Sequence, residues 1–312
     1  MRVLVTGGAG YLGSILVPRL LDAGHHVTVM DTFLYGQTPF LDRLGDGRLE
    51  IRRDDVRIGT AITQALRGQD AIVPLAAIVG APACQRDITA ARTVNLEAVR
   101  LLLRQRSSEQ ILVFPMTTSG YGIGAAEGLC TEASPLLPVS LYGRLKVSAE
   151  SAVLDRPGTV SLRFATLFGP SPRMRLDLLV NDFTWRAVMD GALVLYEGHF
   201  RRNFLHVWDA AGAMLWALER QAEGRLGHRV YNAGLPESNL TKRELCEVIR
   251  HHVPGFRWFE HPAGRDPDRR DCAVDHSRLV GEGWKAERTL DEGILELIRA
   301  YRIVARREHA NA

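Results

Sequence analysis

Hydrophobic and polar positions follow two different periods along the first half of the chain. Short apolar runs rich in β-branched residues, typical of buried strands, lie at 2–6, 26–30, 49–53, 70–77, 110–115 and 159–165. Between them, the segments 11–24, 88–106 and 139–154 carry apolar residues at helical spacing, although Pro18 would kink the first of these helices. Strands that alternate with helices predict an α/β fold with a doubly wound parallel sheet.

The alternation loosens after residue 169. Residues 170–203 and 233–312 have the pattern of a smaller, mixed α/β part, whereas 204–219 is predicted to be a strand and a helix that return to the sheet. We therefore expect one domain over 1–169, joined by 204–232, and a second part over 170–203 and 233–312. The two parts should interweave around a cleft, where open α/β sheets bind their ligands.

A glycine-rich segment, GGAGYLG at 7–13, lies between the first strand and the first helix. Its small residues allow backbone N–H groups at the helix N-terminus to approach a pyrophosphate. Asp31 ends the second strand, where its carboxylate can accept hydrogen bonds from the adenosine ribose and would repel a 2′-phosphate. The segment predicts a Rossmann-like domain that binds NAD rather than NADP.

Composition narrows the choice of partners. The net charge is only +3 and the arginines are scattered among acids, which argues against nucleic acid and membrane surfaces. No apolar run reaches the length of about 20 residues that a membrane helix needs. The four cysteines form no C-x-x-C pair and the ten histidines show no ligand spacing, so we expect reduced thiols, no metal and a cytoplasmic location.

Candidate chemistry centres on Tyr142 and Lys146, which are four residues apart and share one face of a predicted helix. A phenol with a pKa of about 10 is a poor base at neutral pH, but a nearby ammonium favours the phenolate. The hydroxyl-rich stretch TTSGYG at 117–122 precedes this pair and follows the fifth strand. Together these residues predict a site that removes a proton from an alcohol.

Four features of the chain belong together: TGGAGYLG, the acid after the second strand, TTSGYG and YGRLK. In this combination they resemble the extended short-chain dehydrogenase/reductase family, and within it the nucleotide-sugar 4-epimerases and dehydratases. The resemblance implies that Tyr142 is the base, that Lys146 binds the cofactor ribose and lowers the pKa of that phenol, and that Thr117 binds the reacting oxygen. It also implies a set of further cofactor-site residues: Gly7, Gly10, Tyr11, Leu12, Gly13, Asp31, Asp55, Val56, Leu75, Ala76, Ala77 and Asn95.

The same resemblance implies a nucleoside-diphosphate sugar as substrate. The family places diphosphate-binding groups at the positions of Arg173, Arg175, Asn181, Arg202 and Arg270. Cys272 departs from the aromatic residue that the family usually has there. The segments 162–183 and HFRRNFLHVWD resemble a narrower branch that oxidises nucleotide-linked manno-heptoses at C4.

The residues after Thr117 discriminate between reactions of the family. Dehydratases and decarboxylases usually carry an acid there, but this chain has Thr118 and Ser119. We therefore expect oxidation at C4 without elimination. A 4-epimerase that returns the hydride and a dehydrogenase that releases the ketone both remain open, and a non-catalytic NAD-binding sensor is a third reading. The family also implies a homodimer that pairs through helices 88–106 and 139–154, with leucines at 101–103.

Overall fold

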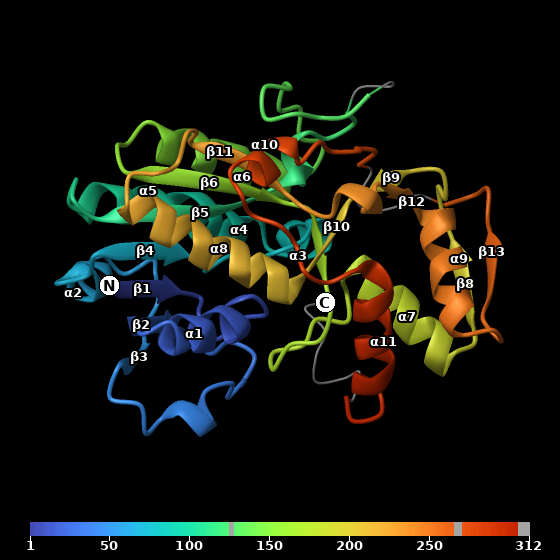
Figure 1. The fold of residues 1–312 in the computed structure, drawn as a ribbon, viewed down its shortest axis with the longest axis horizontal. Helices are drawn as coiled ribbons and strands as arrows, with labels where there is room; N and C mark the ends of the chain where they lie inside the picture. The colour runs from blue at the N-terminus through green and yellow to red at the C-terminus, as the bar shows by residue number, and fades with distance from the viewer. Residues whose placement is uncertain (125–127, 265–269, 305–312) are drawn as a thin grey trace.

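The computed structural model describes residues 1–124, 128–264 and 270–304, and its largest element is a seven-stranded parallel sheet (Figure 1). The strand order is β11-β6-β5-β4-β1-β2-β3, and every neighbouring pair is parallel. The strands are β1 (Arg2–Thr6), β2 (His26–Asp31), β3 (Leu49–Arg53), β4 (Ala71–Pro74), β5 (Ile111–Thr117), β6 (Thr159–Phe164) and β11 (Val230–Ala233). This sheet confirms the predicted fold class.

Helices cover both faces of the sheet, because successive strand residues point to opposite sides. Val3 and Val5 of β1 pack in a hydrophobic cluster with the residues of α1 and α8, whereas Leu4 packs in a second cluster with α2, α5 and α6. The bounds are α1 (Gly13–Asp22), α2 (Gly59–Leu66), α3 (Ala81–Arg86), α4 (Ile88–Arg92), α5 (Ala98–Gln105), α6 (Leu141–Leu154) and α8 (Val207–Ala222). Pro18 lies inside α1.

Several predicted bounds change in the structure. The helix expected over 88–106 is α4 and α5 joined by a π-helical segment, η2 (Thr93–Glu97). The strand expected over 70–77 ends at Pro74, and the residues after it bend away to line a cavity. The segment 204–206 does not join the main sheet: β10 (Phe204–His206) pairs with β7 (Thr166–Phe168), and the seventh strand is β11, which no sequence pattern had indicated.

The rest of the chain forms a smaller α/β region at one end of the sheet (Figure 1). Its helices are α7 (Leu179–Met189), α9 (Lys242–His252) and α11 (Leu290–Ala300), whereas α10 (Ser277–Gly281) lies beside β11 of the main sheet. Its strands form short pairs: β8 (Ala192–Leu195) with β13 (Arg257–Glu260), and β9 (Arg201–Arg202) with β12 (Leu240–Thr241). Trp185, Leu245 and Ile294 of this region belong to the same hydrophobic cluster as Val3, so one continuous core joins it to the sheet.

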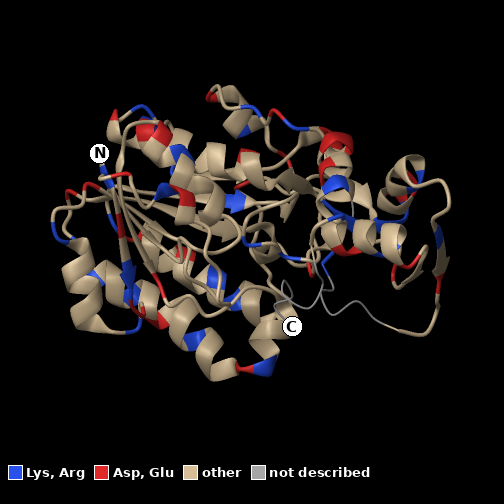
Figure 2. Cartoon of the chain, turned by 90° about the horizontal axis from the view of Figure 1, so that it is seen from below, with Lys and Arg blue, Asp and Glu red and all other residues tan. Residues whose placement is uncertain are grey.

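Charge is interspersed over the fold. Figure 2 shows acidic and basic residues alternating along the outer helices rather than separating into faces of one sign. Within the described ranges, no helix is both long and apolar enough to cross a membrane. All four cysteines are buried, and none of them forms a disulfide.

Candidate active site

A large cavity opens at the carboxyl end of the parallel sheet. It is lined by residues that follow β1, β2, β4 and β5, including Gly7, Asp31, Leu75 and Thr117, and by residues of the smaller region such as Arg202. Its volume is about 1680 Å³, whereas single-ligand sites usually measure about 300–1,000 Å³. The cavity therefore has room for two ligands at once.

The glycine-rich turn forms one wall of this cavity and fits an anionic ligand. Gly7 has a φ of +68°, and a Cβ there would lie 2.5 Å from the backbone nitrogen of Ala76. At Gly13, a Cβ would lie 2.3 Å from the carbonyl oxygen of Gly8. In this fully described turn no side chain caps the first turn of α1, so its positive end faces the cavity. The backbone can therefore approach a pyrophosphate closely.

Asp31 lines the cavity at the end of β2. Its carboxylate accepts hydrogen bonds from the backbone N–H groups of Phe33, at 2.8 Å, and Ala9, at 3.0 Å. Burial raises the pKa of Asp31, while these hydrogen bonds and the charge of Arg173 oppose the increase. The carboxylate is thus fixed next to the glycine turn, where an adenosine ribose would lie.

Arg173 lies at this same end of the cavity. Its guanidinium stacks on Tyr35, 4.0 Å from the ring centroid, and is close enough to Asp31 to influence its pKa. The residues that follow Asp31 in the chain, Thr32 and Phe33, are not basic, so only the fold brings a cation close to this carboxylate. Arg173 was instead expected to bind the diphosphate of the substrate, a role that the structure does not test.

The other proposed cofactor-site residues lie close to the glycine turn. Tyr11, Leu12, Gly10, Asp55, Val56, Leu75, Ala76 and Ala77 all line the cavity. Asp55 is held by Arg57 through hydrogen bonds of 2.5–3.0 Å. Asn95 lies behind the cavity wall, where its side chain accepts from the N–H of Ile78 and donates to the Ile78 carbonyl, both at 2.8 Å. Asn95 therefore fixes the backbone of a residue that lines the cavity.

The three residues with candidate catalytic chemistry converge on this cavity from two elements. Thr117 ends β5, whereas Tyr142 and Lys146 lie one turn apart on α6. Helix α6 begins there because the Ser140 hydroxyl accepts the N–H of Gly143 at 3.0 Å. The Thr117 hydroxyl lies 3.0 Å from that of Ser119, which also lines the cavity.

Lys146 is only 5% exposed, and its Nζ lies 4.1 Å from the centroid of the Phe114 ring. Burial lowers the pKa of this ammonium to about 7, and the carboxylate of Glu150 opposes the decrease. Tyr142 is electrostatically coupled to Arg175, which is also buried in the cavity wall and paired with Asp177 at 2.5 Å. Tyr142 therefore has one basic side chain one helical turn away, Lys146, and interacts with a second, Arg175.

The expected substrate residues lie in four places. Arg202 and Arg270 meet, since the Arg202 guanidinium donates to the Arg270 carbonyl, and both line the cavity. Arg175 lies nearer Tyr142, and Arg173 nearer Asp31. Asn181 is fully buried behind the wall, where it accepts from the N–H of Gly169 at 3.0 Å and donates to the Arg175 carbonyl at 2.8 Å.

Sequence reasoning missed many of the residues that line the cavity, among them Tyr35, Ser119 and Lys242. Lys242 is 3% exposed and donates to the carbonyl oxygen of Tyr196. The hydroxyl stretch could have pointed to Ser119, but Tyr35 and Lys242 have no local signal. Among the described residues, no group of three or more His, Cys, Asp or Glu side chains is arranged to hold a metal ion.

Comparison with known proteins identifies the class to which this fold and site belong. The model of the NAD dependent epimerase/dehydratase family matches residues 3–234, so the chain belongs to that family. NAD is therefore its cofactor, as predicted, and the glycine turn with Asp31 fits this dinucleotide. When bound, NAD supplies a hydride acceptor and donor.

Individual relatives carry out several reactions. The chain is 29% identical over 323 residues to a dTDP-glucose 4,6-dehydratase of Streptomyces niveus, covering 97% of this chain and 93% of the relative. It is also 29% identical to a UDP-glucose 4-epimerase of Corynebacterium glutamicum, covering 93% and 92%. A solved UDP-glucose 4-epimerase from Thermus thermophilus in complex with NAD has a TM-score of 0.81 and 26% identity, covering 98% and 100%. The chain is thus similar to nucleotide-sugar epimerases and dehydratases alike.

Proposed function

We propose that this protein is an NAD-dependent 4-epimerase of a nucleoside-diphosphate sugar. The observation that carries the proposal is the convergence of Thr117, Tyr142 and Lys146 on the cavity that also contains the glycine turn. The cavity volume of about 1680 Å³ would allow a dinucleotide and a sugar nucleotide to lie side by side.

Each residue of this group has a distinct role in the proposed reaction. Tyr142 takes the proton of the C4 hydroxyl as the carbon is oxidised, and returns it when the ketone is reduced from its other face. Lys146 stabilises the phenolate by its charge. Thr117, at the end of β5, donates a hydrogen bond to the reacting oxygen and orients it.

Epimerisation is favoured over elimination by the residues beside Thr117. Thr118 and Ser119 have no carboxylate that could move a proton at the neighbouring carbons of the sugar. Asp177 does line the cavity near Arg175, but both of its oxygens accept hydrogen bonds from that guanidinium, at 3.1 and 2.5 Å. The ion pair would have to break before Asp177 could exchange a proton with a sugar.

The substrate diphosphate would bind at the end of the cavity that Arg202, Arg270 and Lys242 line. Guanidinium groups match phosphate oxygens bidentately, and Lys242 adds a compact charge. The likeness of 162–183 to the heptose-oxidising branch makes a nucleotide-linked manno-heptose the sugar to test first. Net dehydrogenation with release of the 4-keto sugar is the alternative, and a non-catalytic NAD sensor is a more remote one.

Two further expectations remain proposals. We propose a cytoplasmic location, and a homodimer that forms through the helices over 88–106 and 139–154. Leu102 and Leu103 are buried within the chain itself, so of the three consecutive leucines only Leu101 remains partly exposed for such a contact. The dimer therefore rests on family likeness, and light scattering at micromolar concentration would test it.

The proposed base is tested with Tyr142→Phe, assayed against UDP-, GDP-, ADP- and dTDP-sugars that include heptoses, with products identified by NMR. Loss of a general base should reduce kcat by about 10²- to 10⁴-fold. NAD affinity and thermal stability of the variant serve as controls for its fold. Activity within tenfold of the wild type would exclude Tyr142 as the base.

The same assay on the wild type separates the alternatives. A C4 epimer formed without added oxidant supports the epimerase. A ketone that appears only when NADH is reoxidised would identify a dehydrogenase, and tight NAD binding with no turnover of any sugar would identify a sensor.

A further inference from the structure

Glu150 is a buried carboxylate directly behind the candidate active site. It lies four residues after Lys146 on α6, so the two side chains share one face of the helix. Its side chain is 2% exposed. An unpaired charge is costly in such surroundings, so the carboxylate of Glu150 needs partners that stabilise it.

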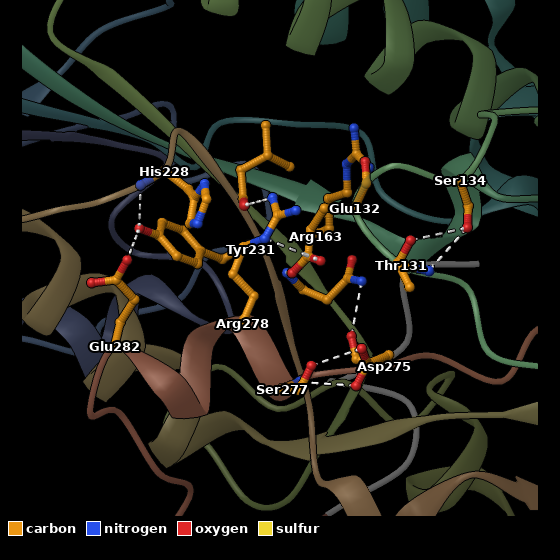
Figure 3. Close-up of polar contacts among 12 residues, drawn as sticks. Thr131, Glu132, Ser134, Arg163, His228, Tyr231, Asp275, Ser277, Arg278 and Glu282 are labelled. Carbon is orange, nitrogen blue, oxygen red and sulfur yellow. Dashed lines mark hydrogen bonds and ion pairs between the residues drawn. The ribbon is translucent and has the colours of Figure 1, made fainter.

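Arg163 of β6 is the ionic partner of Glu150. Its Nε donates to Oε1 at 2.9 Å and its Nη2 to Oε2 at 2.9 Å, and the Ser161 hydroxyl adds a hydrogen bond of 2.6 Å to Oε1. Arg163 itself donates a hydrogen bond of 3.0 Å to the Tyr121 hydroxyl. It donates another of 3.1 Å to the carbonyl of Glu132, which lies beside it in Figure 3. These contacts fix the carboxylate in place beneath Lys146.

We propose that Glu150, oriented by Arg163, is a positioning residue that keeps the ammonium of Lys146 charged inside the cavity. Glu150 lies behind the cavity wall, so it acts through Lys146 rather than on a ligand. Glu150 is thereby added to the residues of the proposed function. Only the expected effect of Glu150 on turnover rests on that function.

The physical need for such a residue follows from the burial of Lys146. Desolvation lowers the pKa of the ammonium to about 7, and Glu150 is the carboxylate that opposes this decrease. With Glu150 in place, a pKa of about 7 leaves a substantial share of the Lys146 amine charged at neutral pH, whereas without a negative charge one turn away the pKa would fall further and that share would shrink. Arg163 partly offsets the charge of Glu150, and it also prevents the carboxylate from turning away.

The other ionisable groups around Lys146 cannot take this role. On the cavity side, Tyr142 lies one turn before Lys146 and interacts with Arg175, and the carboxylate of Asp177, which also lines the cavity, is bound by that guanidinium through both of its oxygens. From α3, burial raises the pKa of the Cys84 thiol to about 11, which leaves it neutral. The charged residues on the outer surface of α4, η2 and α5 pair with one another: Arg92, Glu97 and Arg100. Tyr121, whose pKa burial raises to about 12, faces Arg163.

A direct titration of Lys146 tests the proposal. The chain has three lysines, Lys146, Lys242 and Lys285, so trace labelling with acetic anhydride followed by peptide mass spectrometry can measure each amine separately. In NAD-free protein, Glu150→Gln should lower the apparent pKa of Lys146 by about one unit, because a charge one helical turn away is removed. The exposed Lys285 serves as the internal reference and should not change.

Two further variants separate the effect of the Glu150 charge from the effect of its hydrogen bonds and packing. Ser161→Ala removes a hydrogen bond to Glu150 but keeps its charge, and it should leave the titration of Lys146 near that of the wild type. The double variant Glu150→Gln/Arg163→Met removes both buried charges, so it keeps the test available if the single variant does not fold. In that double variant the pKa of Lys146 should still be lower than in the wild type, even if the removal of both charges restores the stability of the fold.

The pH dependence of activity also reports on the Lys146 amine. If Lys146 must be charged, the basic limb of the pH profile of kcat should move to lower pH in Glu150→Gln by a similar amount. A folded Glu150→Gln protein with an unchanged Lys146 titration would overturn the proposal. A shifted titration with no turnover of any sugar nucleotide by the wild type would instead contradict the proposed function alone.

Discussion

Replacing Asp31 with Asn tests how the cavity selects its dinucleotide. The carboxylate ends β2 and accepts hydrogen bonds from Ala9 and Phe33, at 3.0 and 2.8 Å. Asn has nearly the same shape and keeps an oxygen for one of these amides, so Asp31→Asn mainly removes the charge. Any change in ligand preference then reports on electrostatics rather than on the shape of the turn.

The expected magnitude follows from the hydrogen bonds that a carboxylate can accept. A hydrogen bond to a charged group contributes about 1.5–3 kcal/mol, or roughly 10- to 150-fold in affinity. The wild type should therefore prefer NAD over NADP by that factor. In NADP the 2′-phosphate replaces the ribose hydroxyl that donates this hydrogen bond, and it adds a negative charge next to the carboxylate. In Asp31→Asn the preference should fall to near unity, because Arg173 would then face the phosphate without an opposing carboxylate.

Calorimetric titrations of NAD and NADP into nucleotide-free protein measure the ratio of the two affinities. Asp54→Asn is the matched control, since Asp54 also lines the cavity near the end of β2 and should leave the ratio unchanged. Equal affinities in the wild type would refute the reasoning, as would an Asp31→Asn protein that keeps the full preference for NAD.

Two further predictions concern stability. Asn95→Ala would leave the N–H and carbonyl of Ile78 without their partner, so urea unfolding should show a loss of about 2–4 kcal/mol in the free energy of unfolding. Equal stability of the alanine variant would contradict the role given to Asn95. Burial lowers the pKa of His276 from 6.5 to about 4. Protonation therefore favours the unfolded chain, and the free energy of unfolding should fall by up to ~1.4 kcal/mol per pH unit as pH decreases from about 6.5 to about 4. Urea titrations at several pH values should show a smaller slope in His276→Gln, and an unchanged slope would count against the assignment.

Local patterns in the sequence determined the parts of this protein that depend on short-range geometry. Short apolar runs mark strands that are buried on both faces, and a period of 3.6 marks helices, so these patterns predicted β1–β6, α1 and α6 to within a few residues. The glycine turn was recognisable for a similar reason, because only residues without a Cβ tolerate its close backbone contacts. Tyr142 and Lys146 could be paired because a spacing of four places both on one helix face.

Only the tertiary structure decided which distant residues meet. Asp31 and Arg173 are far apart in the chain, and no local pattern announces their proximity. The pairing of Glu150 with Arg163 joins a helix to a strand, and β10 left the main sheet for β7 because strand partners depend on long-range packing. Side-chain periodicity records which face of an element is buried, but it contains no information on what that face contacts. The sequence therefore determined the elements and the spacing of the proposed catalytic pair, Tyr142 and Lys146, whereas the charges around that pair were brought together only when the chain folded.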